Sequence, residues 1–256
     1  MNDLLIENST CNPVTQELHA TLQCRPSDLY LKQHFPGFPV MPGVLLMEGF
    51  RQLLTSNGGA QCSVDGFDRF RFREFVRPDD EVELNVSVSR ERQVADCVGL
   101  VGGRRVIQGS CRISECESLT NREYRDVLRS ELTSWQWLSH YEELTPAGCS
   151  TAIFNSPSQF DCSRHIPPTI LIEGIAQSGV RLVEQFCPPD HISALVKVTY
   201  ANVESVASYR DTISLDVVAV GVQHDGAILR GVARRSEQVV VSVEFMLAFA
   251  SRRRRV

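Results

Sequence analysis

Apolar and polar residues alternate along most of this chain in short runs with the two-residue period of β-strands. The clearest run is 68–75, where Phe70 and Phe72 face one side and arginines face the other, as in a half-buried strand. Further runs of this kind in the N-terminal half lie at 17–24, 81–89, 93–101 and 104–114. Residues 43–55, by contrast, are apolar on nearly every helical face, which predicts a buried helix.

The same order of elements appears again in the C-terminal half. A second stretch that is apolar on nearly every face, 169–186, predicts a second buried helix. Strands are predicted before and after it, at 150–155, 194–201, 212–222, 227–235 and 238–249. Two pairs of strands are predicted to be joined by tight turns, one at Gly102 and Gly103 and one at 224–226.

The two halves also resemble each other residue by residue. The segment VLLMEGFRQ at 44–52 aligns with TILIEGIAQ at 169–177, at an offset of 125 and with a Glu-Gly pair in register. Downstream, RPDDEVELNV at 77–86 aligns with SYRDTISLDV at 208–217, at an offset of 131. A period this long with only two copies indicates an internal duplication. The predicted fold class is α+β: two units, each an antiparallel sheet wrapped around a buried helix, packed as a pseudo-dimer.

The change of pattern along the chain also suggests domain boundaries. The N-terminal unit is expected to span 1–117 and the C-terminal unit 148–256. Between them, residues 118–147 are polar, rich in Glu and Arg, and contain Trp135 and Trp137. We interpret this stretch as a linker with some helix.

Composition excludes several classes of protein. The formal net charge of −5 is spread over both halves, which argues against a nucleic-acid-binding domain. The longest apolar run, 245–250, is far shorter than the roughly 20 residues of a membrane-spanning helix. The nine cysteines form no CxxC pair, which argues against a zinc knuckle and against a disulfide framework. The first residues lack a basic start and an apolar core, so we expect a cytoplasmic protein.

The residues that carry chemistry lie at 34–48, HFPGFPVMPGVLLME. This stretch resembles the motif of the hotdog-fold 3-hydroxyacyl-ACP dehydratases: a His, a Phe-Pro-Gly, a Pro-x-x-Pro-Gly and an acidic residue fourteen positions after the His. The resemblance implies a double-hotdog fold and a lyase that removes water from a 3-hydroxyacyl thioester on acyl carrier protein. The product would be a trans-2-enoyl thioester in fatty acid, polyene or polyketide biosynthesis. No metal and no organic cofactor is implied.

Removal of water needs a base for the proton on C2 and an acid for the hydroxyl group on C3. Histidine titrates near neutrality and suits the first role. A carboxyl group in a hydrophobic helix suits the second, because burial disfavours its charged form. The charge that develops on the thioester oxygen needs an N–H donor. Gly43 offers one at the predicted helix start after Pro42, because the first amides of a helix have no partner within it.

In the family that this sequence resembles, each site is shared by two units. For this chain the resemblance implies one catalytic site, with His34 and Gly43 from the first unit and Glu173 from the second. The counterparts in the other site are Gln159, Pro168 and Glu48. Glutamine is not a base and proline has no N–H to donate, so we predict one working site and one relic site.

His165 lies eight residues before Glu173 and leaves two interpretations open. It either reaches into the relic site as a substitute base or is a structural or surface histidine.

The resemblance also implies a partner, an acidic acyl carrier protein that presents the substrate on a phosphopantetheine arm. An arginine row on and after the strand at 68–75 either meets this partner or is a solvated strand face; it consists of Arg69, Arg71, Arg73 and Arg77. The chain would act as a monomeric pseudo-dimer or as a homodimer of it. Two other functions stay open: a different hotdog thioester enzyme (thioesterase or acyl transfer) and a non-catalytic acyl-thioester binding module.

Overall fold

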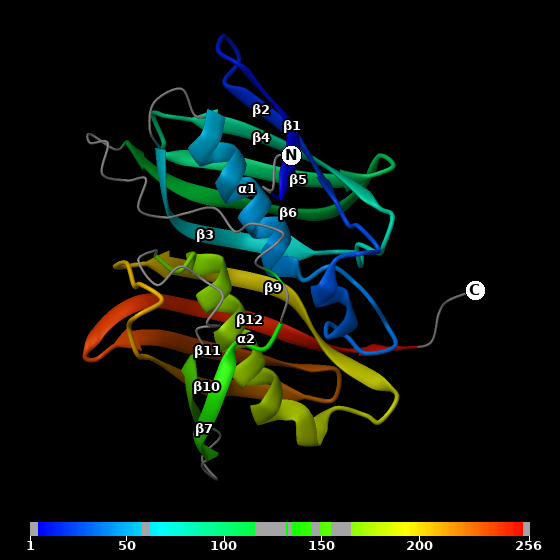
Figure 1. Ribbon diagram of the computed structural model, residues 1–256, viewed down its shortest axis with the longest axis vertical. Coiled ribbons are helices and arrows are strands. Elements are labelled where there is room, and N and C mark those ends of the chain that lie inside the picture. Colours follow the sequence, from blue (N-terminus) through cyan, green and yellow to red (C-terminus); the bar gives the residue numbers. More distant parts are fainter. Residues whose placement is uncertain are drawn as a thin grey trace. The chain divides into compact units, whose positions relative to one another are not determined.

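The computed structural model describes residues 5–57, 62–115, 132, 135–144, 149–154 and 165–252. The chain divides between Trp135 and Gln136 into two compact units. In the described part of the chain, each unit has six antiparallel strands and one α-helix, which lies against the sheet of its own unit (Figure 1). The predicted α+β class is confirmed for both halves.

The first unit is built around helix α1 (Gly43–Asn57), which packs against β1 to β4. A short 3-10 helix, η1 (Leu29–Lys32), precedes it. The strands of this unit are β1 (Ile6–Asn12), β2 (Glu17–Gln23), β3 (Cys62–Phe72), β4 (Glu81–Ser89), β5 (Val94–Val101) and β6 (Arg104–Glu115). They are ordered β1-β2-β4-β5-β6-β3 in the sheet.

The second unit repeats this arrangement around helix α2 (Pro168–Val183), with a 3-10 turn, η4 (Glu184–Phe186), at its end. The strands of this unit are β7 (Leu138–Leu144), β8 (Cys149–Phe154), β9 (His191–Val203), β10 (Ile213–Gln223), β11 (Gly226–Arg235) and β12 (Gln238–Ser251). Their order, β7-β8-β10-β11-β12-β9, is that of the first unit with each strand replaced by its counterpart. The duplication seen in the sequence is therefore a duplication of topology.

The Glu-Gly pair shared by the two helices marks a close approach of helix and sheet. A Cβ on Gly49 would lie 2.8 Å from Leu22 and 2.9 Å from Leu84, on β2 and β4. A Cβ on Gly174 would lie 3.1 Å from both Phe154 and Leu215, on the counterpart strands β8 and β10. A side chain at either position would require these neighbouring side chains to shift, so glycine favours the close packing of helix and sheet.

Both predicted helices and ten of the strands lie where the sequence pattern indicated. Strand β3 begins at Cys62, before the predicted start at 68. The sequence did not reveal this earlier part, because register shifts at 64–66 and 68–71 interrupt the two-residue period. Gly102 and Gly103 have φ of 54° and 77°, as a type I′ hairpin turn requires. No helix among the described residues is long and apolar enough to span a membrane.

Two strands were not predicted. Strand β1 buries Ile6 but exposes most of its residues, so it carries no apolar alternation. Strand β7 lies within 118–147, the stretch that we interpreted as a linker, and it pairs with β8. Both are edge strands at equivalent positions, and each pairs with a neighbour on one side. An edge strand need not show the apolar alternation by which strands are predicted from sequence.

Candidate active site

The loop between η1 and α1 is a fixed structure. Phe35 to Phe38 form a turn in which the Phe38 N–H donates to the Phe35 carbonyl at 2.8 Å. Gly37 has φ of 77°, so Pro36 and Gly37 take the central positions of a type II turn. Further along, the Met41 N–H donates to the Val76 carbonyl at 2.8 Å and ties the loop to the segment after β3.

His34 lies half-buried at the start of this loop. Its Nδ1 is 3.1 Å from the Val40 carbonyl oxygen. Since a carbonyl only accepts, Nδ1 carries the proton and Nε2 carries the lone pair. Burial lowers the pKa of His34 from 6.5 to about 4, although the hydrogen bond to Val40 opposes this shift. The imidazole is therefore neutral at pH 7 and can accept a proton at Nε2.

Gly43 is the first residue of α1, so its N–H has no intrahelical acceptor. Phe72, the last residue of β3, packs directly against it. A Cβ at position 43 would lie 2.7 Å from the Phe72 ring, so the site needs glycine for steric reasons as well.

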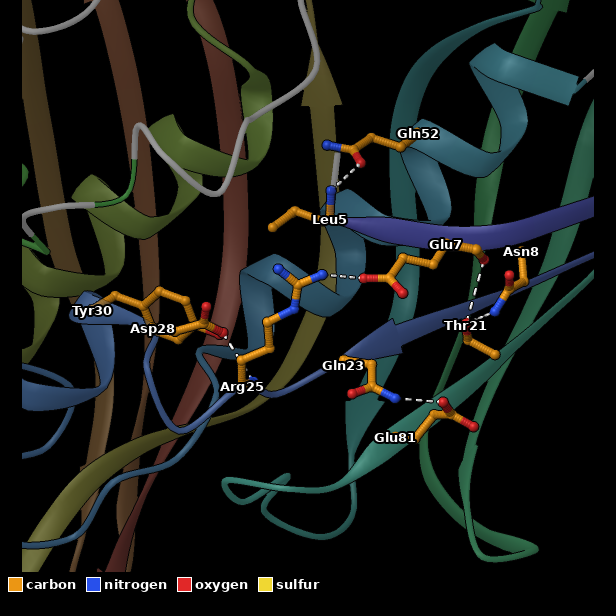
Figure 2. Close-up of polar contacts among 10 residues, drawn as sticks. All are labelled: Leu5, Glu7, Asn8, Thr21, Gln23, Arg25, Asp28, Tyr30, Gln52 and Glu81. Carbon is orange, nitrogen blue, oxygen red and sulfur yellow. Dashed lines mark hydrogen bonds and ion pairs between the residues drawn. The ribbon is translucent and has the colours of Figure 1, made fainter. Parts of the chain in front are cut away.

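Glu48 is fully buried in α1 and is engaged by two neighbours on the same helix. Arg51, itself 2% exposed, donates to both carboxylate oxygens at 2.7 and 2.8 Å. Gln52 donates its Nε2 to Glu48 at 3.2 Å and accepts the Leu5 N–H at 3.1 Å through Oε1 (Figure 2). Glu48 and Arg51 thus form a buried, bidentate ion pair.

Glu173 occupies the same position on α2 and is 6% exposed. Gln177 donates to its carboxylate at 3.0 Å and accepts the Trp137 N–H at 3.1 Å. This glutamine bridge repeats that of Gln52 in the first unit. The arginine is not repeated, because Ala176 stands at the position of Arg51.

Position 168 differs in its backbone from its counterpart, Gly43. Pro168 is the first residue of α2 and follows Pro167, so the helix begins without an N–H at the counterpart of Gly43. Gln159 lies outside the described residues.

His165 does not stand at the counterpart of His34. The Ile166 N–H donates to the Ala207 carbonyl at 2.7 Å, as the Met41 N–H donates to Val76 in the first unit. His165 is therefore the counterpart of Val40 and forms a β-bridge with Ser208.

The four arginines Arg69, Arg71, Arg73 and Arg77 are all exposed. The Arg77 guanidinium lies 5.2 Å from the centroid of the buried Phe38 ring. Phe38 belongs to the loop between η1 and α1, which carries the candidate base His34 and is termed the catalytic loop. The arginine row thus continues to the edge of that loop. Among the described residues, no group of three or more His, Cys, Asp or Glu side chains could hold a metal ion.

Sequence reasoning missed Arg51, Gln177 and Trp135. The first two were visible in the aligned helices, where both copies carry a Gln four residues after the Glu but only the first copy carries an Arg. Trp135 left no such signal, because its contacts with His34 and Tyr30 are about a hundred residues away in sequence.

Part of the chain is similar in sequence to known dehydratases. A model of the ApeI-like family, described as ApeI dehydratase, matches residues 10–98. The 3-hydroxyacyl-[acyl-carrier-protein] dehydratase FabZ of Pelotomaculum thermopropionicum is 39% identical over 70 residues, 25% of this chain and 50% of the relative. FabZ of Haemophilus influenzae (strain PittEE) is 41% identical over 68 residues, 23% of this chain and 46% of the relative. The N-terminal unit is thus similar in sequence to 3-hydroxyacyl dehydratases over part of its length.

The hotdog dehydratase match spans about half the length of these curated relatives. Solved structures extend the likeness in fold to the whole chain. The dehydratase domain of PpsC from Mycobacterium tuberculosis, in complex with C12:1-CoA, has a TM-score of 0.70 at 12% identity, over 97% of this chain and all of that one. The dehydratase domain from the CurJ module of curacin polyketide synthase has a TM-score of 0.68 at 11% identity, over 96% and 97%. The fold is a double hotdog.

Proposed function

We propose that this hotdog dehydratase removes water from a 3-hydroxyacyl thioester carried by acyl carrier protein and releases the trans-2-enoyl thioester. The observation that carries the proposal is the state of His34: a neutral imidazole with its proton fixed on Nδ1 by Val40 and its lone pair on Nε2. It lies in the family's His-Phe-Pro-Gly motif. The relatives named FabZ supply the reaction type.

In the proposed reaction the His34 Nε2 removes the proton from C2 of the substrate. The Gly43 N–H donates to the thioester oxygen while negative charge accumulates there, an interaction that typically contributes about 10² to 10³ in rate. The Glu173 carboxyl gives its proton to the hydroxyl on C3, and the C3–O bond breaks to release water. The imidazolium then returns a proton to the Glu173 carboxylate, which restores both groups.

The assignment of the acid to Glu173 rests on the contrast between the two helices. Glu48 accepts two charge-assisted hydrogen bonds from Arg51, and such a carboxylate is stabilised as an anion. Helix α2 carries Ala176 at the position of that arginine, and Glu173 accepts a hydrogen bond from the neutral amide of Gln177 at 3.0 Å. A neutral amide can hydrogen-bond a protonated carboxyl as well as a carboxylate, so this contact is compatible with an acid at position 173.

We infer one composite site, with His34 and Gly43 from the first unit and Glu173 from the second. The relic site would hold Glu48, Gln159 and Pro168. In this proposal the hotdog units of 1–117 and 148–256 act as the two halves of a pseudo-dimer within one chain.

An acidic acyl carrier protein would bind the exposed arginine row of 69–77, which leads to Phe38 in the catalytic loop. We also propose a cytoplasmic location. Cys97 and Cys111 are free thiols with sulfur atoms 3.7 Å apart, and free thiols are typical of reducing compartments.

The deciding experiment incubates the purified chain with a 3-hydroxyacyl carrier-protein thioester and follows the acyl group by mass spectrometry. Loss of one water supports the proposal, released acid indicates a thioesterase, and an unchanged bound thioester indicates a binding module. Dehydration should disappear in His34→Ala and Glu173→Gln and persist in the matched control Glu48→Gln.

A further inference from the structure

We propose that Trp135 is a positioning residue for the base, His34: it keeps the imidazole in its hydrogen bond to Val40 and excludes water from the ring. The inference rests on the proposed function for its role in catalysis, but the contacts themselves do not depend on it. Trp135 follows the six strands of the first unit in the sequence and is 101 residues from His34, which it contacts.

Three contacts fix Trp135 against the start of the catalytic loop. Its ring makes an edge-type contact with the His34 imidazole, with centroids 6.1 Å apart and planes at 74°. It also packs against Tyr30 of η1 at 5.6 Å. Its backbone N–H donates to the side-chain oxygen of Gln33. Trp135 is 4% exposed, so its side chain is almost completely buried.

The imidazole is thereby held by three groups, two from its own loop and one from a distant part of the chain. The Phe35 ring lies 4.3 Å from it, Trp135 contacts it from the end of the unit, and the Val40 carbonyl holds Nδ1. Together they restrict rotation of the ring. A ring that rotates away from Val40 could carry its proton on either nitrogen, and only one of these tautomers leaves Nε2 able to accept a proton.

The effect of Trp135 on the pKa of His34 through exclusion of water can be separated from the effects of nearby charged groups. Besides His34, a titratable group packed against Trp135 among the described residues is Tyr30, whose hydroxyl donates to the Asp28 carboxylate at 2.9 Å (Figure 2). Asp28 also accepts the Arg25 N–H at 3.1 Å. The pKa of His34 is lowered by burial and not by either of these groups. Removing the indole should therefore admit water and raise that pKa.

The test is histidine-selective NMR on the full chain, with His34 assigned by its loss in His34→Gln. In the wild type the ring should titrate near 4 in the Nδ1–H tautomer. In Trp135→Ala the midpoint should rise by about one unit or more toward 6.5, with Trp135→Leu intermediate and Trp135→Phe close to the wild type. Where the chain dehydrates substrate, kcat should fall about tenfold in Trp135→Ala with little change in KM, and Trp135→Phe should restore it.

The matched control is Phe67→Leu, which removes an equally buried ring in the same unit, packed on Phe70 rather than on His34. It should lower stability and leave the His34 midpoint unchanged. A folded Trp135→Ala or Trp135→Leu protein with an unshifted midpoint and tautomer overturns the inference; the Leu variant decides the matter if the Ala variant does not fold. If the His34 titration midpoint shifts in the Trp135 variants but the wild-type chain does not dehydrate its substrate, the proposed function is refuted. The inference that Trp135 positions the His34 ring is then still supported.

Discussion

Replacement of Arg51 by alanine tests whether Glu48 is a structural anion. The side chains of Glu48 and Arg51 are 0% and 3% exposed, and two hydrogen bonds of 2.7 and 2.8 Å join them. Removing one partner of such a pair leaves an uncompensated buried charge, which typically costs about 3 to 5 kcal/mol. Arg51→Ala should therefore lower the free energy of unfolding of the first unit by about that amount.

The assay is urea unfolding followed by a probe in each unit, because two units need not unfold together. The double variant Glu48→Leu/Arg51→Leu is the matched comparison, since it removes both charges and keeps apolar volume; it should recover most of the loss. If the losses of stability in Glu48→Leu and Arg51→Leu add up to the loss in the double variant, the two side chains are not coupled and the reasoning is refuted. A loss below about 1 kcal/mol in Arg51→Ala would refute it as well. Dehydration at saturating substrate should persist in every variant that stays folded, because the proposed mechanism assigns the acid to Glu173 and not to Glu48.

Three further predictions concern the catalytic groups and the docking surface. Since the imidazole must be neutral to act as base, kcat/KM should stay level from pH 7 down to about 5 and fall as the pH drops through about 4; an acid limb near 6.5 would contradict the buried state of His34. Gly43→Ala should lower both activity and melting temperature, because its Cβ would lie 2.7 Å from the Phe72 ring, and Phe72→Leu in the same chain should recover stability more than activity. Arg71→Glu with Arg73→Glu should raise KM for a carrier-protein substrate at low salt and leave KM for a pantetheine thioester unchanged; equal effects on both substrates would argue against docking at the arginine row.

Sequence alone located the features that depend on local spacing. The two helices and ten strands follow from hydrophobic period, because a buried face recurs every two residues in a strand and an entirely buried helix is apolar all round. The duplication follows from the aligned Glu-Gly pairs, and the turn glycines 102 and 103 adopt the positive φ expected of them. The candidate catalytic residues His34, Gly43 and Glu173 rest on the motif and this alignment.

Tertiary structure decided what no local spacing could. Edge strand β1 has too few buried residues to show a period, so its pairing with β2 identifies it. The protonated nitrogen of His34 depends on which carbonyl its ring meets, and the need for glycine at 43 depends on Phe72 reaching it from another strand. Trp135 and His34 are in contact although they lie 101 residues apart in the sequence. This contact can form only after the sheet between them has folded, so no local pattern in the sequence predicts it.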